Sequence, residues 1–127
     1  MNESADQVLV CVTRQKACEQ LIRAGAQLAR EGEKGLMVVH VAPFGENILG
    51  NPQEGEALDY LFTIAKQYGA AMQMLRSEDV AGTLAEYARE HAVGCMVLGS
   101  SGKPRSMLRE LKQQLPQVDF HMEEYKG

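Results

Sequence analysis

The sequence lacks an apolar run long enough to cross a membrane, because no stretch approaches the ~20 apolar residues that a spanning helix needs. It also lacks an excess of basic charge: 13 Lys and Arg stand against 17 Asp and Glu, a net charge of −4. Nucleic-acid-binding surfaces are clustered and basic, so we expect no nucleic-acid partner. The polar start, "MNESADQ", is unlike a signal peptide. We therefore expect a cytoplasmic protein without direct membrane contact, or a piece of a larger membrane-anchored one.

Residues with catalytic or metal-binding patterns are equally scarce. The three cysteines have no metal-ligand spacing. Cys11 and Cys95 lie in apolar runs, where each is either a small buried hydrophobic residue or half of a redox pair across neighbouring strands. There is no nucleophile elbow of the Gly-x-Ser-x-Gly type. His40 ends an apolar run and either supports the fold or faces a site. We expect neither an enzyme nor a metal site.

What the sequence does contain is a regular alternation of strand-like and helix-like periods. Continuous apolar runs at 8–12, 36–41 and 95–99 predict strands buried on both faces. Alternating runs at 70–75 and 118–122 predict half-covered strands, which belong at the edges of a sheet. The helical periods lie between and after these runs, over residues 15–31, 58–68, 80–91 and 107–115.

This order of elements predicts an α/β fold. Connections of helix length join parallel strands, and right-handed crossovers then place helices on both faces of the sheet. With three central strands and two edge strands, the simplest arrangement is an open five-stranded parallel sheet in the order 3-2-1-4-5. The whole chain, 1–127, is of a size typical of one domain.

In that order the sheet reverses direction between strands 1 and 4, the place where open α/β sheets bind ligands. The loops "TRQKAC" and "GSSGKPRS" meet there. Gly99 and Gly102 permit a tight turn with outward N–H groups, and Lys103 adds a positive charge. The spacing matches neither a Walker loop nor a dinucleotide fingerprint. Two interpretations therefore stay open, a phosphate cradle and a plain turn.

Several stretches together resemble one known family. They are "VLVCV", "CEQLIRAGAQLAR", "GLMVVHV", "EDVAGTLAEYAREHAVGCMVLGSS" and "LPQVDFHM". Over residues 7–123 their order and spacing are similar to the universal stress protein (UspA-like) family. The nearest likeness is to the stress-protein-like domain of Kdp-type potassium sensor histidine kinases. The resemblance implies the same Rossmann-like sheet, in the order 3-2-1-4-5.

The resemblance also implies a degenerate nucleotide site. Nucleotide-binding members carry an Asp just after strand 1, whereas this sequence has Thr-Arg-Gln at 13–15. They also carry Gly-x-x-Gly followed, nine residues later, by Gly-Ser/Thr, whereas here Gly99-Ser100-Ser101-Gly102 is followed by Lys112-Gln113. We therefore expect no obligatory cofactor, or at most weak binding of ATP or another nucleotide.

Two functions follow as hypotheses. The first is a non-enzymatic stress-response or signalling domain, acting as a regulatory homodimer or as a sensor-kinase module with a protein partner. The alternative is a sensor of ATP or a cyclic dinucleotide that uses the loops after strands 1 and 4. Lys16 adds to the positive charge there, and the ligand would contact Arg14, Gly99, Ser100, Ser101, Gly102, Lys103 and Arg105.

The homodimer is implied by the resemblance, since family members often pair through the fifth strand. An alternating edge strand offers unpaired backbone groups, which suits such pairing. Val118, Phe120 and Met122 would form one face of this strand. Alternatively, that face packs on the last helix and the edge stays in water.

Overall fold

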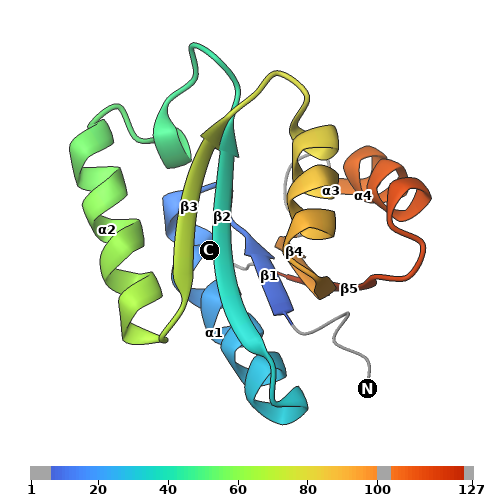
Figure 1. Ribbon diagram of the computed structural model, residues 1–127. Coiled ribbons are helices and arrows are strands. Elements are labelled where there is room, and N and C mark those ends of the chain that lie inside the picture. The colour runs from blue at the N-terminus through green and yellow to red at the C-terminus, as the bar shows by residue number, and fades with distance from the viewer. Residues whose placement is uncertain (1–6, 100–103, 125–127) are drawn as a thin grey trace.

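A computed structural model describes residues 7–99 and 104–124 of the chain, and side chains within 7–99 and 107–124. Strands and α-helices alternate along these residues, and one short 3-10 helix interrupts the connection after the second strand (Figure 1). The elements are β1 (Gln7–Cys11), α1 (Gln15–Gly32), β2 (Gly35–Ala42), η1 (Ile48–Gly50), α2 (Glu54–Gln67), β3 (Ala71–Arg76), α3 (Val80–Glu90), β4 (Val93–Gly99), α4 (Pro104–Gln114) and β5 (Asp119–Glu123).

The sheet has five parallel strands in the order β3-β2-β1-β4-β5, which confirms the predicted topology. Val10 in β1 lies between Val38 in β2 and Val97 in β4, and all three side chains are fully buried. The continuous apolar runs therefore form the centre of the sheet, as their patterns indicate. The edge strands β3 and β5 keep exposed or half-buried positions along their length.

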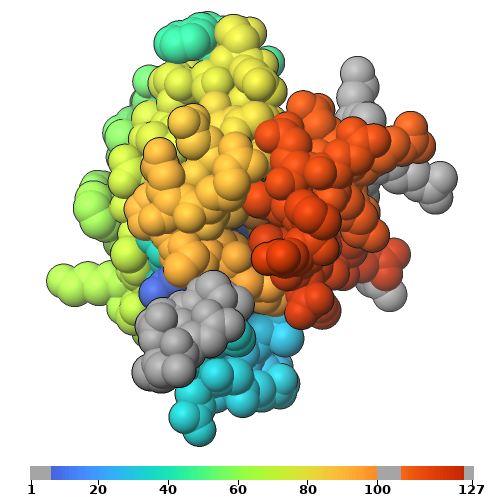
Figure 2. All heavy atoms as spheres, turned by 45° about the vertical axis from the view of Figure 1, so that its right-hand side comes forward, coloured from blue at the N-terminus to red at the C-terminus, as the bar shows by residue number. Residues whose placement is uncertain are grey.

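Alternate side chains of the central strands pack into two separate hydrophobic cores, one on each face of the sheet. Val8 and Val10 pack with α1, α2 and η1, whereas Leu9 and Cys11 pack with α3 and α4. Figure 1 shows the two helical pairs on opposite sides of the sheet, and Figure 2 shows α3 and α4 side by side on one face. Burial of these apolar side chains is the main source of stability, at about 25 cal/mol per Å² removed from water.

Local signals position the helices on this sheet. Gly25 lets α1 approach β1 closely, because a Cβ at Gly25 would collide with the Val10 side chain. The Asp79 carboxylate accepts a hydrogen bond from the Gly82 amide at 3.0 Å and caps α3, and Ser77 accepts one from the Asp79 amide at 3.1 Å.

In the described ranges no helix combines the length and apolarity needed to cross a membrane.

The cysteines do not form a pair across neighbouring strands. Cys95 lies opposite Val8 in the β1–β4 register and faces the α1–α2 core, whereas Cys11 faces the α3–α4 core. The redox-pair interpretation is therefore wrong. Burial raises the pKa of the Cys11 thiol strongly and that of Cys18 to about 12, so both thiols stay protonated at neutral pH.

The apolar residues at the β5 edge contact the protein's own core. Val118, just before β5, and Phe120 and Met122 within it are partly buried against the α3–α4 core. The opposite face of β5 presents Asp119, His121 and Glu123. The two faces of this edge strand therefore differ sharply in polarity.

Candidate functional site

The carboxyl ends of the strands open into a cavity of about 480 Å³. Thr13 and Arg14 line it after β1, and His40 lines it from the end of β2. The connection that follows β2 forms one wall, and α3 and α4 contribute Val80 and Met107. This space, here called the carboxyl-edge cavity, lies at the carboxyl ends of β1 and β2, the end of the sheet at which open α/β proteins bind ligands.

His40 holds the wall of this cavity in place. Its side chain is buried, and Nδ1 lies 2.8 Å from the Val12 carbonyl oxygen. The Leu49 amide donates to Nε2 at 3.0 Å. A carbonyl only accepts and an amide only donates, so the ring is neutral with its proton on Nδ1. Burial lowers the pKa of His40; the Val12 bond opposes this shift and the Arg76 charge adds to it.

The residue that His40 holds has an unusual backbone conformation. Leu49 adopts φ 55° in the left-handed region, which is uncommon for a side chain of this size. Ile48 and Leu49 are both buried under the α1–α2 core. Their burial and the bond to His40 together stabilise this turn, which sets the path of residues 43–50 along the cavity.

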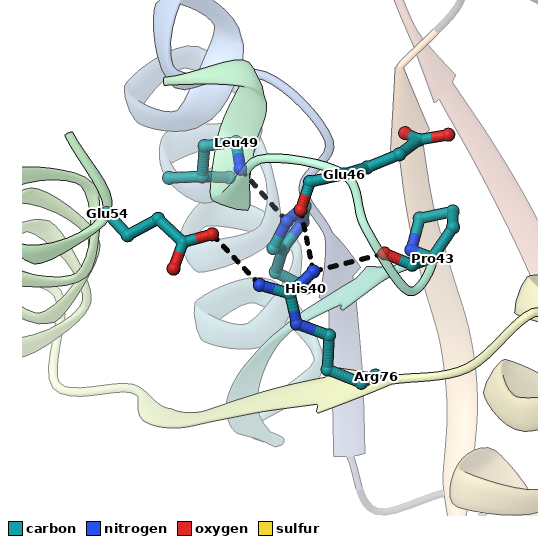
Figure 3. Close-up of polar contacts among 6 residues, drawn as sticks. All are labelled: His40, Pro43, Glu46, Leu49, Glu54 and Arg76. Carbon is teal, nitrogen blue, oxygen red and sulfur yellow. Dashed lines mark hydrogen bonds and ion pairs between the residues drawn. The ribbon is translucent and has the colours of Figure 1, made fainter. Parts of the chain in front are cut away.

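Arg76, at the end of β3, anchors the same connection from the other side. Nη1 donates to the carbonyl oxygens of Pro43 at 3.0 Å and Glu46 at 2.6 Å, and Nη2 binds the Glu54 carboxylate at 3.0 Å (Figure 3). One guanidinium therefore ties the first turn of the connection to the start of α2. Such forked, charge-assisted bonds are specific to arginine.

Positive charge gathers where α1 begins. Arg14 is the N-cap residue of α1, no side chain caps the helix, and its first turn has no acidic residue. A second cavity of about 610 Å³ lies beside this helix end, and Arg14 and Lys16 both line it. Helix N-termini carry partial positive charge, so this end of the sheet favours an anion.

Solved structures with the same arrangement identify the fold. A universal stress family protein from Burkholderia pseudomallei superposes with a TM-score of 0.68 at 19% identity, over 97% of this chain and 98% of that one. The chain has the universal stress protein fold. A universal stress protein from Archaeoglobus fulgidus in complex with dAMP matches at TM-score 0.58 and 18% identity, over 99% and 100%. Another, in complex with cAMP, matches at 0.62 and 15%, over 98% and 100%.

Sequence relatives point to sensor proteins. A sensor protein KdpD from Mycobacterium tuberculosis is 32% identical over 105 residues, which cover 81% of this chain and 12% of that protein. A putative KdpD sensor from Synechocystis is 25% identical over 124 residues, covering 92% and 33%. This universal stress protein fold therefore spans a third or less of these relatives. No family model matches the chain. The predicted resemblance to universal stress proteins and Kdp-type sensors is confirmed.

The structure brings only some of the predicted site residues together. Arg14 lines both cavities of this universal stress protein fold, and Lys16 lines the second. Gly99 ends β4 beside Leu21 and is not among the residues that line either cavity. Ser100, Ser101, Gly102, Lys103 and the Arg105 side chain lie outside the described residues, so their roles stay predictions.

Sequence reasoning missed the residues that shape the cavity wall. The roles of His40 and Arg76 depend on partners far along the chain, and the only sequence signal was a histidine at the end of an apolar strand. Across the described residues no three His, Cys, Asp or Glu side chains are grouped to hold a metal ion. At the carboxyl-edge cavity Arg14 and Glu46 supply opposite charges.

Proposed function

We propose that this chain is a non-enzymatic regulatory domain of the universal stress protein type, working in cytoplasmic signalling as a homodimer or as a module of a sensor kinase. The observation that carries the proposal is the combination of this fold with 32% identity to a sensor protein. His40 adds support, because both of its ring nitrogens are engaged in structural hydrogen bonds. A general base needs a free nitrogen.

In this proposal the homodimer forms through the β5 edge, where unpaired backbone groups meet a second copy. We expect the wild-type protein to sediment at twice the 14.0 kDa of one chain at micromolar concentration. Met122→Lys should shift it to the monomer, because a charged side chain facing the α3–α4 core disturbs the position of β5 and therefore its pairing edge. Sedimentation equilibrium measures this shift, and circular dichroism checks that the variant is folded.

The matched control is His121→Lys on the opposite face of β5, which already carries Asp119 and Glu123. This variant should remain dimeric, since a lysine beside the Glu123 carboxylate is compatible with that polar face. A wild-type protein that stays monomeric across the concentration range would contradict pairing through β5. Equal dissociation of both variants would contradict the role of the apolar face.

A second candidate function is a nucleotide sensor for ATP or a cyclic dinucleotide. The observation that favours it is Arg14, a cation at the helix start that lines both cavities at the carboxyl edge of the sheet. Proteins of the same fold are known in complex with cAMP and dAMP. In this proposal Arg14 binds the phosphate, and the ligand also contacts Gly99, Ser100, Ser101, Gly102, Lys103 and Arg105.

The test is mass spectrometry of the purified protein for a bound nucleotide, followed by calorimetric titration with ATP, cAMP and a cyclic dinucleotide. Arg14→Gln should weaken binding about tenfold, the effect of losing one charge-assisted hydrogen bond. Arg23→Gln is the matched control: Arg23 lies on the exposed face of the same helix, paired with Glu19, and should bind like wild type. No heat of binding at millimolar nucleotide would contradict the sensor function.

A further inference from the structure

One buried hydrogen bond joins His40 to the connection that forms a wall of the carboxyl-edge cavity. The Leu49 amide donates to His40 Nε2, and Leu49 itself is 2% exposed. Leu49 follows the segment 43–47, from which Pro43, Gly45 and Glu46 line the cavity. The acceptor for this amide is therefore a titratable nitrogen. Arg76, the Glu78 carboxylate and the packing of Ile48 and Leu49 also hold this connection.

We propose that His40 is a proton-operated latch, in which protonation of Nε2 releases the Leu49 amide and loosens residues 43–50 along the cavity. The latch itself needs no ligand. Its regulatory consequence rests on the proposed nucleotide site, because loosening this wall disturbs the cavity in which that ligand would bind. Acidification would therefore lower the affinity for nucleotide.

The proton balance of the step is simple. In the closed state Nδ1–H donates to the Val12 carbonyl and Nε2 accepts from the Leu49 amide. A proton taken from water converts the ring to an imidazolium, whose two nitrogens are both donors. Nε2–H then faces the Leu49 N–H, so two donors oppose each other and the buried amide has lost its acceptor. An unpaired buried amide is unfavourable, so the protonated state favours an open connection in which water satisfies both groups.

Among the charges around His40, that of Arg76 acts in the same direction as burial. Arg76 from β3 opposes a second positive charge at the ring, and Arg14, before α1, lines the same cavity. Glu46 from the connection also lines the cavity, whereas Glu54 from α2 is paired with Arg76. Glu78, after β3, binds the Phe44 amide, and α3 and α4 contribute the uncharged Val80 and Met107. Burial is the largest cause that lowers the pKa of His40.

The pH range follows from the sign of this shift. The closed state binds the proton less well than the open state, whose histidine has the ordinary pKa of about 6.5. The latch is therefore fully stable above about pH 6.5 and weakens as the pH falls from there towards the lower closed-state pKa. Within that window the open fraction should rise by up to about tenfold per pH unit.

The experiment measures hydrogen exchange at the Leu49 amide in the ligand-free protein by NMR, corrected for intrinsic exchange, between about pH 7.5 and 5. We expect Leu49 protection to fall by up to about tenfold per pH unit below about 6.5, while the Leu115 amide, bonded to the Leu111 carbonyl, keeps its protection. In His40→Gln the side-chain oxygen can accept from Leu49 without titrating, so protection should not depend on pH. His121→Gln, which removes a histidine from β5, should behave like wild type.

A second variant guards against failure of His40→Gln to fold. His40→Asn keeps a donor near the position of Nδ1 but no acceptor for Leu49, so Leu49 protection should be low at every pH. Wild-type protection that does not change with pH would overturn the latch, as would a pH-dependent loss in either His40 variant.

Calorimetry with ATP at about pH 7.5 and 6 separates the latch from the nucleotide site. If ATP does not bind at either pH, only the proposed nucleotide site is contradicted. If the affinity for ATP is the same at both pH values although the Leu49 amide loses protection at the lower one, the proposed regulation of binding is wrong.

Discussion

Leu21→Ala should lower the free energy of unfolding by about 3–5 kcal/mol, the largest effect that we expect from a single substitution in this chain. Leu21 lies in α1 with 1% of its surface exposed, within the core shared by α1, α2 and the sheet. It also approaches the end of β4, since a Cβ at Gly99 would lie 3.5 Å from its Cδ1. Alanine leaves a cavity at this point, and urea denaturation measures the loss.

The matched control lies about two helical turns away in α1. Leu28 is only partly buried against the same core, so Leu28→Ala should cost about 1 kcal/mol, the transfer free energy of a partly exposed side chain. Both variants change leucine to alanine within α1, so helix propensity is the same in each. Equal losses in the two variants would contradict the assignment of Leu21 to the centre of the core.

The fold could be predicted from the sequence because burial of its strands leaves a direct pattern. Val10 has apolar neighbours on both sides along the chain because β1 is covered on both faces of the sheet. The boundaries were predicted less well. The helical period of α2 begins at Leu58, whereas the helix begins at Glu54. The first turn carries Glu54 and Glu56, whose carboxylates suit a helix N-terminus but leave no apolar period.

The site could be predicted only in outline. Arg14 follows a central strand, so the topology alone places it at the carboxyl edge, where it lines both cavities. His40 is different, because its partners lie 28 residues away at Val12 and 9 residues away at Leu49. No local period encodes those contacts. They arise from the register of β1 against β2 and from the left-handed turn at Leu49.

The second large effect is expected from substitution of Arg76. It should change both the free energy of unfolding and the pH dependence of Leu49 protection. Arg76→Leu removes the donors to the Pro43 and Glu46 carbonyls and the ion pair with Glu54. We expect it to lower the free energy of unfolding by about 1–3 kcal/mol, chiefly through the two carbonyls, because the half-exposed ion pair contributes little. Urea denaturation measures the loss, and hydrogen exchange at the Glu46 amide should rise.

Arg76→Leu should also move the latch. The Arg76 charge lowers the pKa of His40, so its removal raises that pKa towards the ordinary value, and the acid-induced loss of Leu49 protection should become smaller and level off at a higher pH. Arg76→Lys is the matched control: it keeps the charge but cannot donate to both carbonyls and Glu54 through a fork, so it should lose stability while the pH midpoint stays near wild type. A midpoint that moves equally in both variants would show that Arg76 acts on His40 through the position of the connection. A midpoint that moves only in Arg76→Leu would show that it acts through its charge.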